Sequence, residues 1–411
     1  MVLGGLPPPA SSSSSSADES KMTIEEQAQH RIKLKSHQQR IPLKGHLGDV
    51  RSARFFPSGQ VLLTTSSDLT IRLYSLQGVN PRIFKGHKRA ITATQILSRG
   101  KRFLSASLDG TVRLWDVAAE RCLKTIPVKR MSGVESLSVV RVSGHETDAV
   151  EDGMGKYIIF AGLSSGWIDV ISLRLDLVKP QQPPADDAEE GDGPIPAEVS
   201  LTDESLVSIP PTVYPSDTQG KEPGATDFWS LDATGSIWSL DAVRGSTAAA
   251  DEDTILVAAG TKSGVVRFFS LRLSALNAIE QAKHAERDNP DAVPMDTDTS
   301  GAGDESLPFQ EHFNFRRNTS GVTNLRFLPF PPGSDSSAVP DIVIATHDGT
   351  PARISLDPQE GTSSLDNVVP RVKEEYVGWE AGDPVEGIAI EQQSDRVFLA
   401  GAEGCVRAYA L

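Results

Sequence analysis

The chain has 411 residues, 38% of them hydrophobic, which is enough for a sizeable core in two or three ordinary domains or in one large repeat fold. Its 40 Lys and Arg are outnumbered by 55 Asp and Glu, and the net charge of −15 argues against broad binding to nucleic acid or anionic membranes. Two cysteines, Cys122 and Cys405, are too few for a disulfide framework and indicate a reducing intracellular compartment. The N-terminus shows no secretory signal, and no run of about 18 apolar residues predicts a transmembrane helix.

The first 40 residues divide into two segments that precede the first expected strand. Residues 1–20 are of low complexity and are expected to form a disordered tail. Residues 21–40 are basic, and we expect a short helix within them. The folded domain is expected to occupy residues 41–411.

An internal repeat begins at residue 45, and its first two copies are sharp. They share a Gly-His pair, a turn aspartate and a strand-ending aromatic residue at a constant spacing of 41 residues: Gly45-His46 and Gly86-His87, Asp68 and Asp109, Tyr74 and Trp115. Alternating runs such as residues 111–115 predict strands with opposed faces, and turn signals separate these runs. A fixed period of this size indicates a repeat architecture.

Four weaker copies follow with the same order of strand, strand, turn and strand, centred on residues 157–162, 255–260, 342–346 and 397–401. A short inner strand, marked by a Val or Ile step, precedes each of the six copies: Val50, Ile91, Val134, Ile237, Val322 and Val385. The pattern therefore predicts six clear units.

These repeats resemble the WD40 repeat, since Leu114-Trp115-Asp116 ends the second copy with the dipeptide that names it. The resemblance implies an all-β propeller of six or seven blades, with a seventh either around residues 228–241 or in the N-terminal segment. It also implies a hydrogen-bonded chain of structural residues within the sharp copies: His46, Asp68, His87, Ser107 (or Ser105), Asp109 and Trp115. Residues 40–44 are expected to add a fourth strand to the last blade and so close the ring.

Two acidic stretches interrupt the repeats. Residues 176–227 carry twelve acids and two lysines, a net charge of −10, and residues 277–310 carry eight acids and two bases, a net charge of −6. Both are rich in Pro, Gly, Ser, Thr and Asp, so we expect solvated, mobile insertions.

One catalytic motif occurs in the sequence, but its context argues against catalysis. Residues 162–166 match the G-x-S-x-G elbow, which requires a turn from a strand to a helix, whereas here a strand follows. The scattered histidines and two separate cysteines offer no zinc-binding spacing. We therefore expect a binding protein that is not an enzyme and that uses no cofactor and no metal.

Propellers present loops on a rigid scaffold, so the ends of the inner strands predict a partner-binding face. The candidate residues are Asp49, Arg51, Ser67, Leu108, Glu135, Trp238, Thr323 and Glu386. Three of them, Asp49, Glu135 and Glu386, predict a partly acidic patch that would steer a basic partner. Trp238 is the aromatic residue best suited to an interaction hot spot.

Within the WD40 class, residues 54–59, 84–88 and 104–111 are similar to the proteasomal ATPase-associated factor family. The resemblance implies a chaperone of proteasome regulatory-particle assembly that binds the C-terminal domain of an ATPase subunit. It also implies a monomer in the cytoplasm and nucleus, with no nucleic-acid or membrane partner.

Two other functions fit the same fold. A substrate receptor of a cullin-type ubiquitin ligase usually has an Arg two residues after the Trp-Asp pair, and this chain has Ala118 there. An RNA- or chromatin-associated scaffold requires a basic face, for which the sequence offers a local cluster: Lys85, Lys88, Arg89, Lys101 and Arg102.

Overall fold

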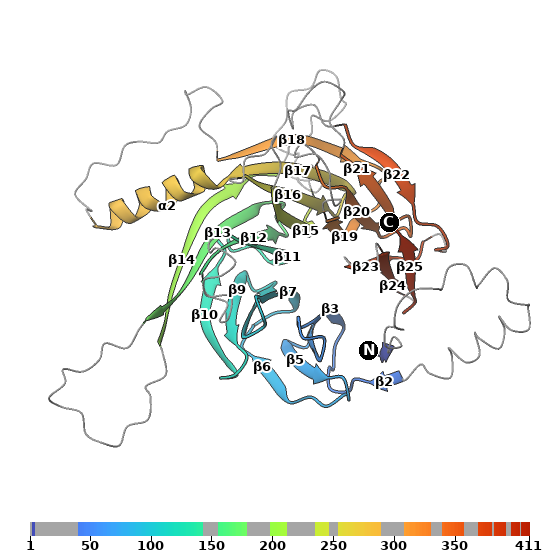
Figure 1. The fold of residues 1–411 in the computed structure, drawn as a ribbon, viewed down its shortest axis with the longest axis horizontal. Coiled ribbons are helices and arrows are strands. Elements are labelled where there is room, and N and C mark those ends of the chain that lie inside the picture. Colours follow the sequence, from blue (N-terminus) through green and yellow to red (C-terminus); the bar gives the residue numbers. More distant parts are fainter. Residues whose placement is uncertain are drawn as a thin grey trace, which may run out of the picture.

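The structure is a computed structural model, and it describes residues 2–4, 40–142, 155–178, 198–211, 235–245, 254–288, 308–329, 339–356, 369–379, 382–391, 396–402 and 404–411. Within these residues, six antiparallel sheets stand around a central channel as the blades of a propeller (Figure 1). The expected fold class is confirmed, with six blades. Among the described residues, no helix has both the length and the apolar character needed to cross a membrane.

Each blade is a meander whose first strand lines the channel. Blade 1 comprises β3 (Val50–Phe55), β4 (Val61–Ser66), β5 (Thr70–Ser75) and β6 (Arg82–Lys85), and blade 2 comprises β7 (Ile91–Leu97), β8 (Arg102–Ser107), β9 (Thr111–Asp116) and β10 (Arg121–Pro127). Blade 3 comprises β11 (Val134–Arg141), β12 (Gly155–Leu163), β13 (Ile168–Val178) and β14 (Glu198–Ile209).

Blade 4 comprises β15 (Ile237–Arg244), β16 (Thr254–Thr261), β17 (Val265–Arg272) and β18 (Phe309–Arg316), with helix α2 (Leu273–Asp288) between its last two strands. Blade 5 comprises β19 (Val322–Phe327), β20 (Ile342–Thr346), β21 (Ala352–Ser355) and β22 (Arg371–Glu375). Blade 6 has three described strands, β23 (Val385–Glu391), β24 (Arg396–Gly401) and β25 (Val406–Ala410). All six inner strands begin at the predicted Val or Ile.

The predicted closure of the ring by residues 40–44 is wrong. β2 (Arg40–Pro42) pairs with β1 (Val2–Gly4) in a separate two-stranded sheet, and among the described strands β25 pairs with β24 alone. The disordered tail predicted for residues 1–20 is also wrong at its start, because β1 lies within it. The rest of that tail, and the helix expected within residues 21–40, lie outside the described residues.

The two acidic stretches are more structured than expected. Residues 198–209 form the outer strand β14, because alternating apolar residues such as Val199 and Leu201 pair along β13. Residues 277–288 belong to α2, whose Leu276 is buried against blade 4. The remaining residues of both stretches lie outside the described part of the chain, apart from short segments at their ends.

The hydrophobic core lies between neighbouring blades. Five clusters of buried apolar side chains fill the interfaces between blades 1 and 2, 2 and 3, 3 and 4, 4 and 5, and 5 and 6. Within the described residues, no such cluster joins blade 6 to blade 1. At this seam Phe55 of β3 is 50% exposed.

Hydrogen bonds between inner strands follow the same order around the ring. The hydroxyl of Ser136 in β11 donates to the carbonyl of Ile237 in β15, and that of Ser239 in β15 donates to the carbonyl of Val322 in β19. Gly387 holds the matching position in β23 and has no side chain to donate. No hydrogen bond joins β23 to β3 in the described part of the chain, so the described blades leave a seam open between blades 6 and 1.

A buried chain of hydrogen bonds knits blade 2. The Trp115 indole N–H donates to the Ser105 hydroxyl at 2.8 Å, Ser105 contacts His87 Nε2 at 2.7 Å, and His87 Nδ1 donates to Asp109 at 2.9 Å. The prediction of Ser107 in this chain is wrong, and the alternative Ser105 is the member. Ser107 ends β8, so its hydroxyl bonds the turn backbone at Arg89 and Asp109.

Blade 1 contains a shorter version of this chain. His46 lies 2.9 Å from Asp68 and 2.8 Å from the hydroxyl of Thr64. The aromatic residue is Tyr74, whose hydroxyl donates instead to the carbonyl of Lys44 at 3.0 Å. The repeat of blade 2, which ends in Trp115-Asp116, therefore has a longer hydrogen-bond network than the repeat of blade 1.

The network of blade 2 predicts loss of stability in acid. Burial lowers the pKa of His87 below its ordinary 6.5, although the hydrogen bond and charge of Asp109 oppose the shift. Burial alone would raise the pKa of Asp109, but hydrogen bonds from Thr111, the Lys88 N–H and His87 hold it below its ordinary 3.8. The unfolded chain therefore takes up a proton at each of these two groups more readily than the folded chain does. Each group thus stabilises the fold at pH values above its ordinary pKa, and this stabilisation is lost as the pH falls.

We expect the urea midpoint to fall from neutral pH to about pH 5 through His87, and further below that through Asp109. Urea titrations across this range, read by tryptophan fluorescence, measure the effect. The variant His87→Gln should flatten the decline above about pH 5 and leave the lower one. An unchanged slope in this variant would show that His87 is not the group that titrates.

Candidate functional site

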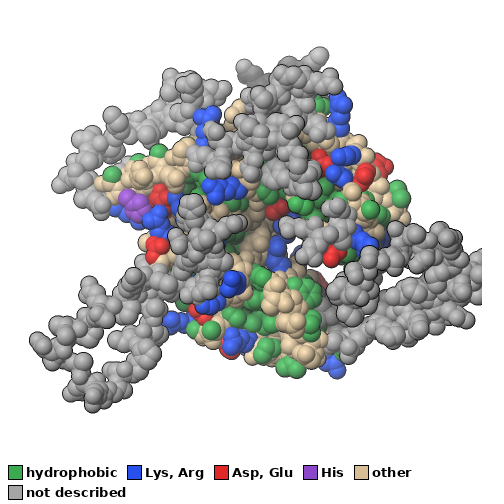
Figure 2. Space-filling model, viewed as in Figure 1, with side chains coloured by type: hydrophobic (Ala, Val, Ile, Leu, Met, Phe, Trp, Pro, Cys, Tyr) green, Lys and Arg blue, Asp and Glu red, His purple; other side chains and the backbone are tan. Residues whose placement is uncertain are grey.

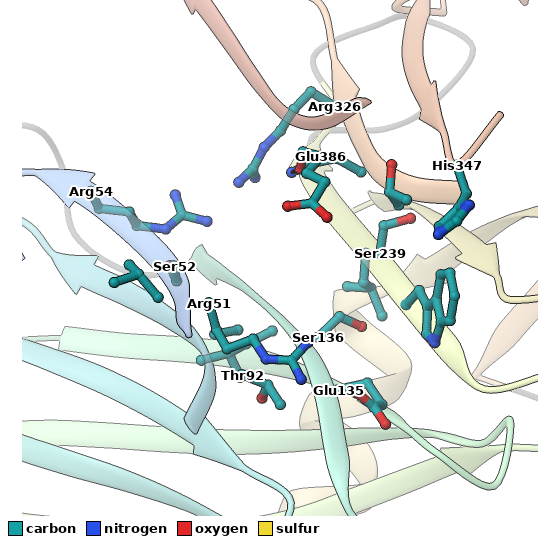
Figure 3. A pocket seen from close by; sticks show the side chains of 17 residues that line it. Arg51, Ser52, Arg54, Thr92, Glu135, Ser136, Ser239, Arg326, His347 and Glu386 are labelled. Atoms are coloured by element: carbon teal, nitrogen blue, oxygen red, sulfur yellow. Dashed lines mark hydrogen bonds between the residues drawn. The ribbon is translucent and has the colours of Figure 1, made fainter. Parts of the chain in front are cut away.

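The site is built by one position of each inner strand, the residue after the Val or Ile step. Because strand side chains alternate, this residue points into the channel in all six blades. We call this set the channel mouth: Arg51, Thr92, Glu135, Trp238, Thr323 and Glu386. Together with the next positions of the inner strands it lines a cavity of about 390 Å³ (Figure 3).

Five of the eight predicted face residues belong to the channel mouth: Arg51, Glu135, Trp238, Thr323 and Glu386. The other three lie on the loops around it. The Asp49 and Ser67 backbones bond each other across the first repeat, and the Leu108 carbonyl accepts from Arg89. The repeat register is thus sufficient to predict which inner-strand residues line the cavity. The three candidates on loops do not line it.

Two members of the predicted partly acidic patch, Glu135 and Glu386, line the cavity, and basic side chains accompany them. Burial raises the pKa of Glu135, and the nearby cations Arg51, Lys262 and Arg89 oppose that shift. Glu386 faces the same cavity, but Arg54 and Arg326 line it too (Figure 3). The mouth therefore offers mixed charge, and Figure 2 shows charged side chains of both signs around the centre of the ring.

Trp238 is half-buried at the mouth and is held from two sides. Gly321 packs against its ring so closely that an added Cβ would lie 2.7 Å from Cζ3. The Lys262 ammonium lies 5.7 Å from the ring centroid, and the His347 ring lies 6.4 Å away. A half-buried indole fixed by such neighbours suits an anchor for a protein partner.

A deeper layer of the channel was not predicted. Arg54 and Arg326 point into the cavity (Figure 3), and Arg326 pairs with Asp241 at 3.1 Å. Arg54 has no hydrogen-bond partner among the described residues, and burial, with the charge of Arg326, lowers its pKa to about 9. All three residues stand four positions after the Val or Ile step, a register that the sequence contains. A free guanidinium there can pair with a carboxylate.

The G-x-S-x-G motif lies in the turn between β12 and β13. The Ser164 hydroxyl lies 2.8 Å from that of Ser132, and its backbone N–H donates to the carbonyl of Gly133. The turn joins two strands, so the context that this motif requires for a nucleophile is missing.

Three side chains at helix α2 have the composition of a metal site, since Glu204, Glu280 and His284 bring ligand atoms within 4.8 Å of one another. However, Lys156 forms an ion pair with Glu280, and Ser172 donates to its second oxygen at 3.0 Å. The Lys156 ammonium thus already supplies positive charge beside these side chains, and we infer that the three residues help to dock α2 on blade 3.

The comparison with known proteins supports this description. Residues 37–75 and 78–116 match the family model described as WD domain, G-beta repeat. The chain is 35% identical over 139 residues to 26S proteasome regulatory subunit RPN14 of Saccharomyces cerevisiae, a match covering 31% of this chain and 33% of that protein.

One further sequence relative and one solved structure are also similar to this chain. Pre-mRNA-processing factor 17 of Homo sapiens is 37% identical over 82 residues, which cover 19% of this chain and 14% of that protein. The β-propeller domain of Cps50 (Swd1) from Myceliophteria thermophila covers 89% of this chain and 88% of its own at 13% identity, with a TM-score of 0.47. The matched segments span a third or less of the two sequence relatives. Over its described residues the chain is thus a β-propeller of six blades, and residues 37–75 and 78–116 carry repeats of the WD domain, G-beta repeat type.

Proposed function

We propose that this propeller is a non-catalytic chaperone that holds the C-terminal domain of a proteasomal ATPase subunit during assembly of the regulatory particle. The partner class rests on one observation, the 139-residue match to a regulatory subunit of the proteasome, which extends beyond the two sharp repeats. The channel mouth supplies the surface, because it gathers charged and aromatic side chains on a rigid frame.

Such a chaperone makes and breaks no covalent bonds. The rigid face would cover the ATPase domain and prevent premature docking on the proteolytic core. Release would follow when the growing complex competes for the same surface. Mixed charges at the mouth favour orientation of the partner over strong attraction at long range.

The test is a titration of the full chain with the isolated C-terminal domain of each proteasomal ATPase. We expect one domain to bind selectively, and Trp238→Ala to weaken that binding about 30-fold, as loss of a central aromatic anchor does. Isothermal calorimetry measures both. The matched control is Val79→Ala, an exposed residue in the turn between β5 and β6 at the opposite end of the blades, which should leave affinity unchanged.

Failure of every ATPase domain to bind would contradict the proposed partner. Equal losses in Trp238→Ala and Val79→Ala would contradict the channel mouth as the binding surface. Selective binding that resists both substitutions would place the partner elsewhere on the ring.

A further inference from the structure

Charge is strongly segregated between the first two blades and the rest of the chain. Residues 40–141 contain 18 Lys and Arg and 6 Asp and Glu, a net charge of +12, whereas the whole chain carries −15. Residues 1–39 are neutral, with four charges of each sign, so residues 142–411 carry −27. Blades 1 and 2 are therefore a basic sector of an acidic protein.

The few acids of this sector are mostly occupied. Asp68 and Asp109 accept hydrogen bonds inside the repeat turns, and Asp116 accepts from the Ala119 N–H at 2.8 Å. Glu120 pairs with Arg82 at 3.1 Å. These carboxylates therefore do little to neutralise the exposed cations.

Six exposed cations lie at the end of the ring where the inner strands begin, five of them on the loops that lead into those strands and Lys85 at the end of β6. We call them the basic face: Lys44, Lys85, Lys88, Arg89, Lys129 and Arg130. None of the six forms an ion pair with another described residue. On the side of the ring seen in Figure 2, Lys and Arg side chains lie around an area of hydrophobic side chains over blades 1 and 2.

Three large apolar side chains stand among these cations without cover. Leu47 is 94% exposed, Met131 is 93% exposed and Leu69 is 38% exposed. Leu47 and Leu69 flank Asp68, which accepts from the Leu47 N–H at 3.0 Å. Met131 lies beside the corresponding turn of blade 2, where a Cβ on Gly110 would meet its Cα at 3.8 Å. The apolar residues thus form a row across both blades.

Two of these residues also hold an unfavourable backbone conformation. Leu69 has φ 67° and Met131 has φ 49°, in the left-handed region that residues with a side chain rarely adopt. Blade 2 has Gly110 at the position of Leu69, so the turn itself does not require leucine. Because these side chains are exposed, they bury no apolar surface in the folded chain that would offset the backbone strain. Backbone strain of this kind is concentrated at binding sites.

We propose that the basic face binds an acidic protein segment that sets carboxylates against the lysines and apolar side chains against Leu47, Leu69 and Met131. Charge complementarity identifies the partner as acidic, and the aliphatic row favours a protein segment over nucleic acid. Single-stranded nucleic acid binds through base stacking on aromatic residues. The loops that carry these cations contain no Phe, Tyr or Trp, and the neighbouring Trp167 ring is covered by the Arg130 guanidinium, 3.2 Å from its centroid. This surface lies beside the channel mouth and does not depend on the identity of the ATPase partner.

The test is fluorescence anisotropy on the full chain with a labelled peptide of alternating glutamate and leucine. We expect binding that weakens with salt, and at least a tenfold loss in the double variant Lys85→Glu and Lys88→Glu. The matched control is Arg99→Glu with Arg121→Glu, two exposed cations at the opposite end of blade 2, which should change affinity less than about twofold. None of these four side chains forms a hydrogen bond with a described residue.

A second variant separates the apolar row from the charge. Leu47→Ser with Met131→Ser keeps the charge and should weaken the peptide about tenfold, and a peptide with serine in place of leucine should bind the wild type equally poorly. Circular dichroism and urea unfolding check that each variant is folded. Equal losses in the two charge-reversal variants, or tight binding of labelled poly-uridine RNA with none of the peptide, would overturn the proposal.

Discussion

Replacing Asp109 with alanine is expected to lower the free energy of unfolding by about 3–5 kcal/mol, because one carboxylate holds the turn of blade 2 together. It accepts from His87 Nδ1, from the Lys88 N–H at 2.9 Å and from both the N–H and the hydroxyl of Thr111. Without it, the buried His87 donor loses its acceptor while Ser105 still holds the other ring nitrogen. Urea unfolding followed by tryptophan fluorescence measures the loss.

The chain contains two matched controls for this substitution. Asp68→Ala removes the equivalent carboxylate from the turn of blade 1, where no indole extends the hydrogen-bond network. It should cost about 1 kcal/mol less than Asp109→Ala. Asp116→Ala removes the one hydrogen bond that this carboxylate accepts from the Ala119 N–H, and should cost about 1 kcal/mol. Equal costs at Asp109 and Asp116 would show that the buried network adds nothing to the turn.

The second large effect is expected at helix α2. Lys156 is buried and reaches Asn277 at 2.7 Å as well as Glu280. Burial alone would raise the pKa of Glu280, but the hydrogen bond and charge of Lys156 hold it below its ordinary range. Lys156→Met leaves that carboxylate without its main partner, so we expect a loss of about 3–5 kcal/mol.

A double-mutant cycle tests the same ion pair. Combining Lys156→Met with Glu280→Met replaces the pair by apolar side chains of similar length, and this double variant should recover most of the lost stability. Lys124→Met breaks the more exposed pair with Asp203 at 2.8 Å and should cost less than about 1 kcal/mol. If the double variant is as unstable as Lys156→Met, the ion pair does not account for the loss.

The repeat register is the part of the architecture that could be predicted from sequence. The Val or Ile step marks the start of all six inner strands, and the residue after it faces the channel in each. This alternation follows from strand geometry and needs no knowledge of tertiary contacts. The same register would have shown that Arg54 and Arg326 lie one layer deeper, at the position of Asp241.

Other features depend on contacts that no repeat pattern contains. Ser105 and Ser107 lie on the same side of β8, and only the reach of the Trp115 indole selects Ser105. Likewise, the sign of charge at the mouth depends on Lys262, which comes from a turn in blade 4. Strand β14 was not predicted because it lies within a long acidic stretch, residues 176–227, although its own apolar residues, such as Val199 and Leu201, alternate in the sequence.

The open seam gives this ring two ends, so its blades should unfold as a linear array of repeats. In such an array each unit is stabilised only by its neighbours, and the terminal units have one neighbour instead of two. Blades 1 and 6 should therefore open locally at lower free energy than blades 3 and 4, and amide hydrogen exchange should be fastest at β23–β25 and slow in β12 and β16. A partner that contacts both blade 1 and blade 6 would give each of them a second neighbour. The blades would then unfold together in one cooperative transition instead of one after another.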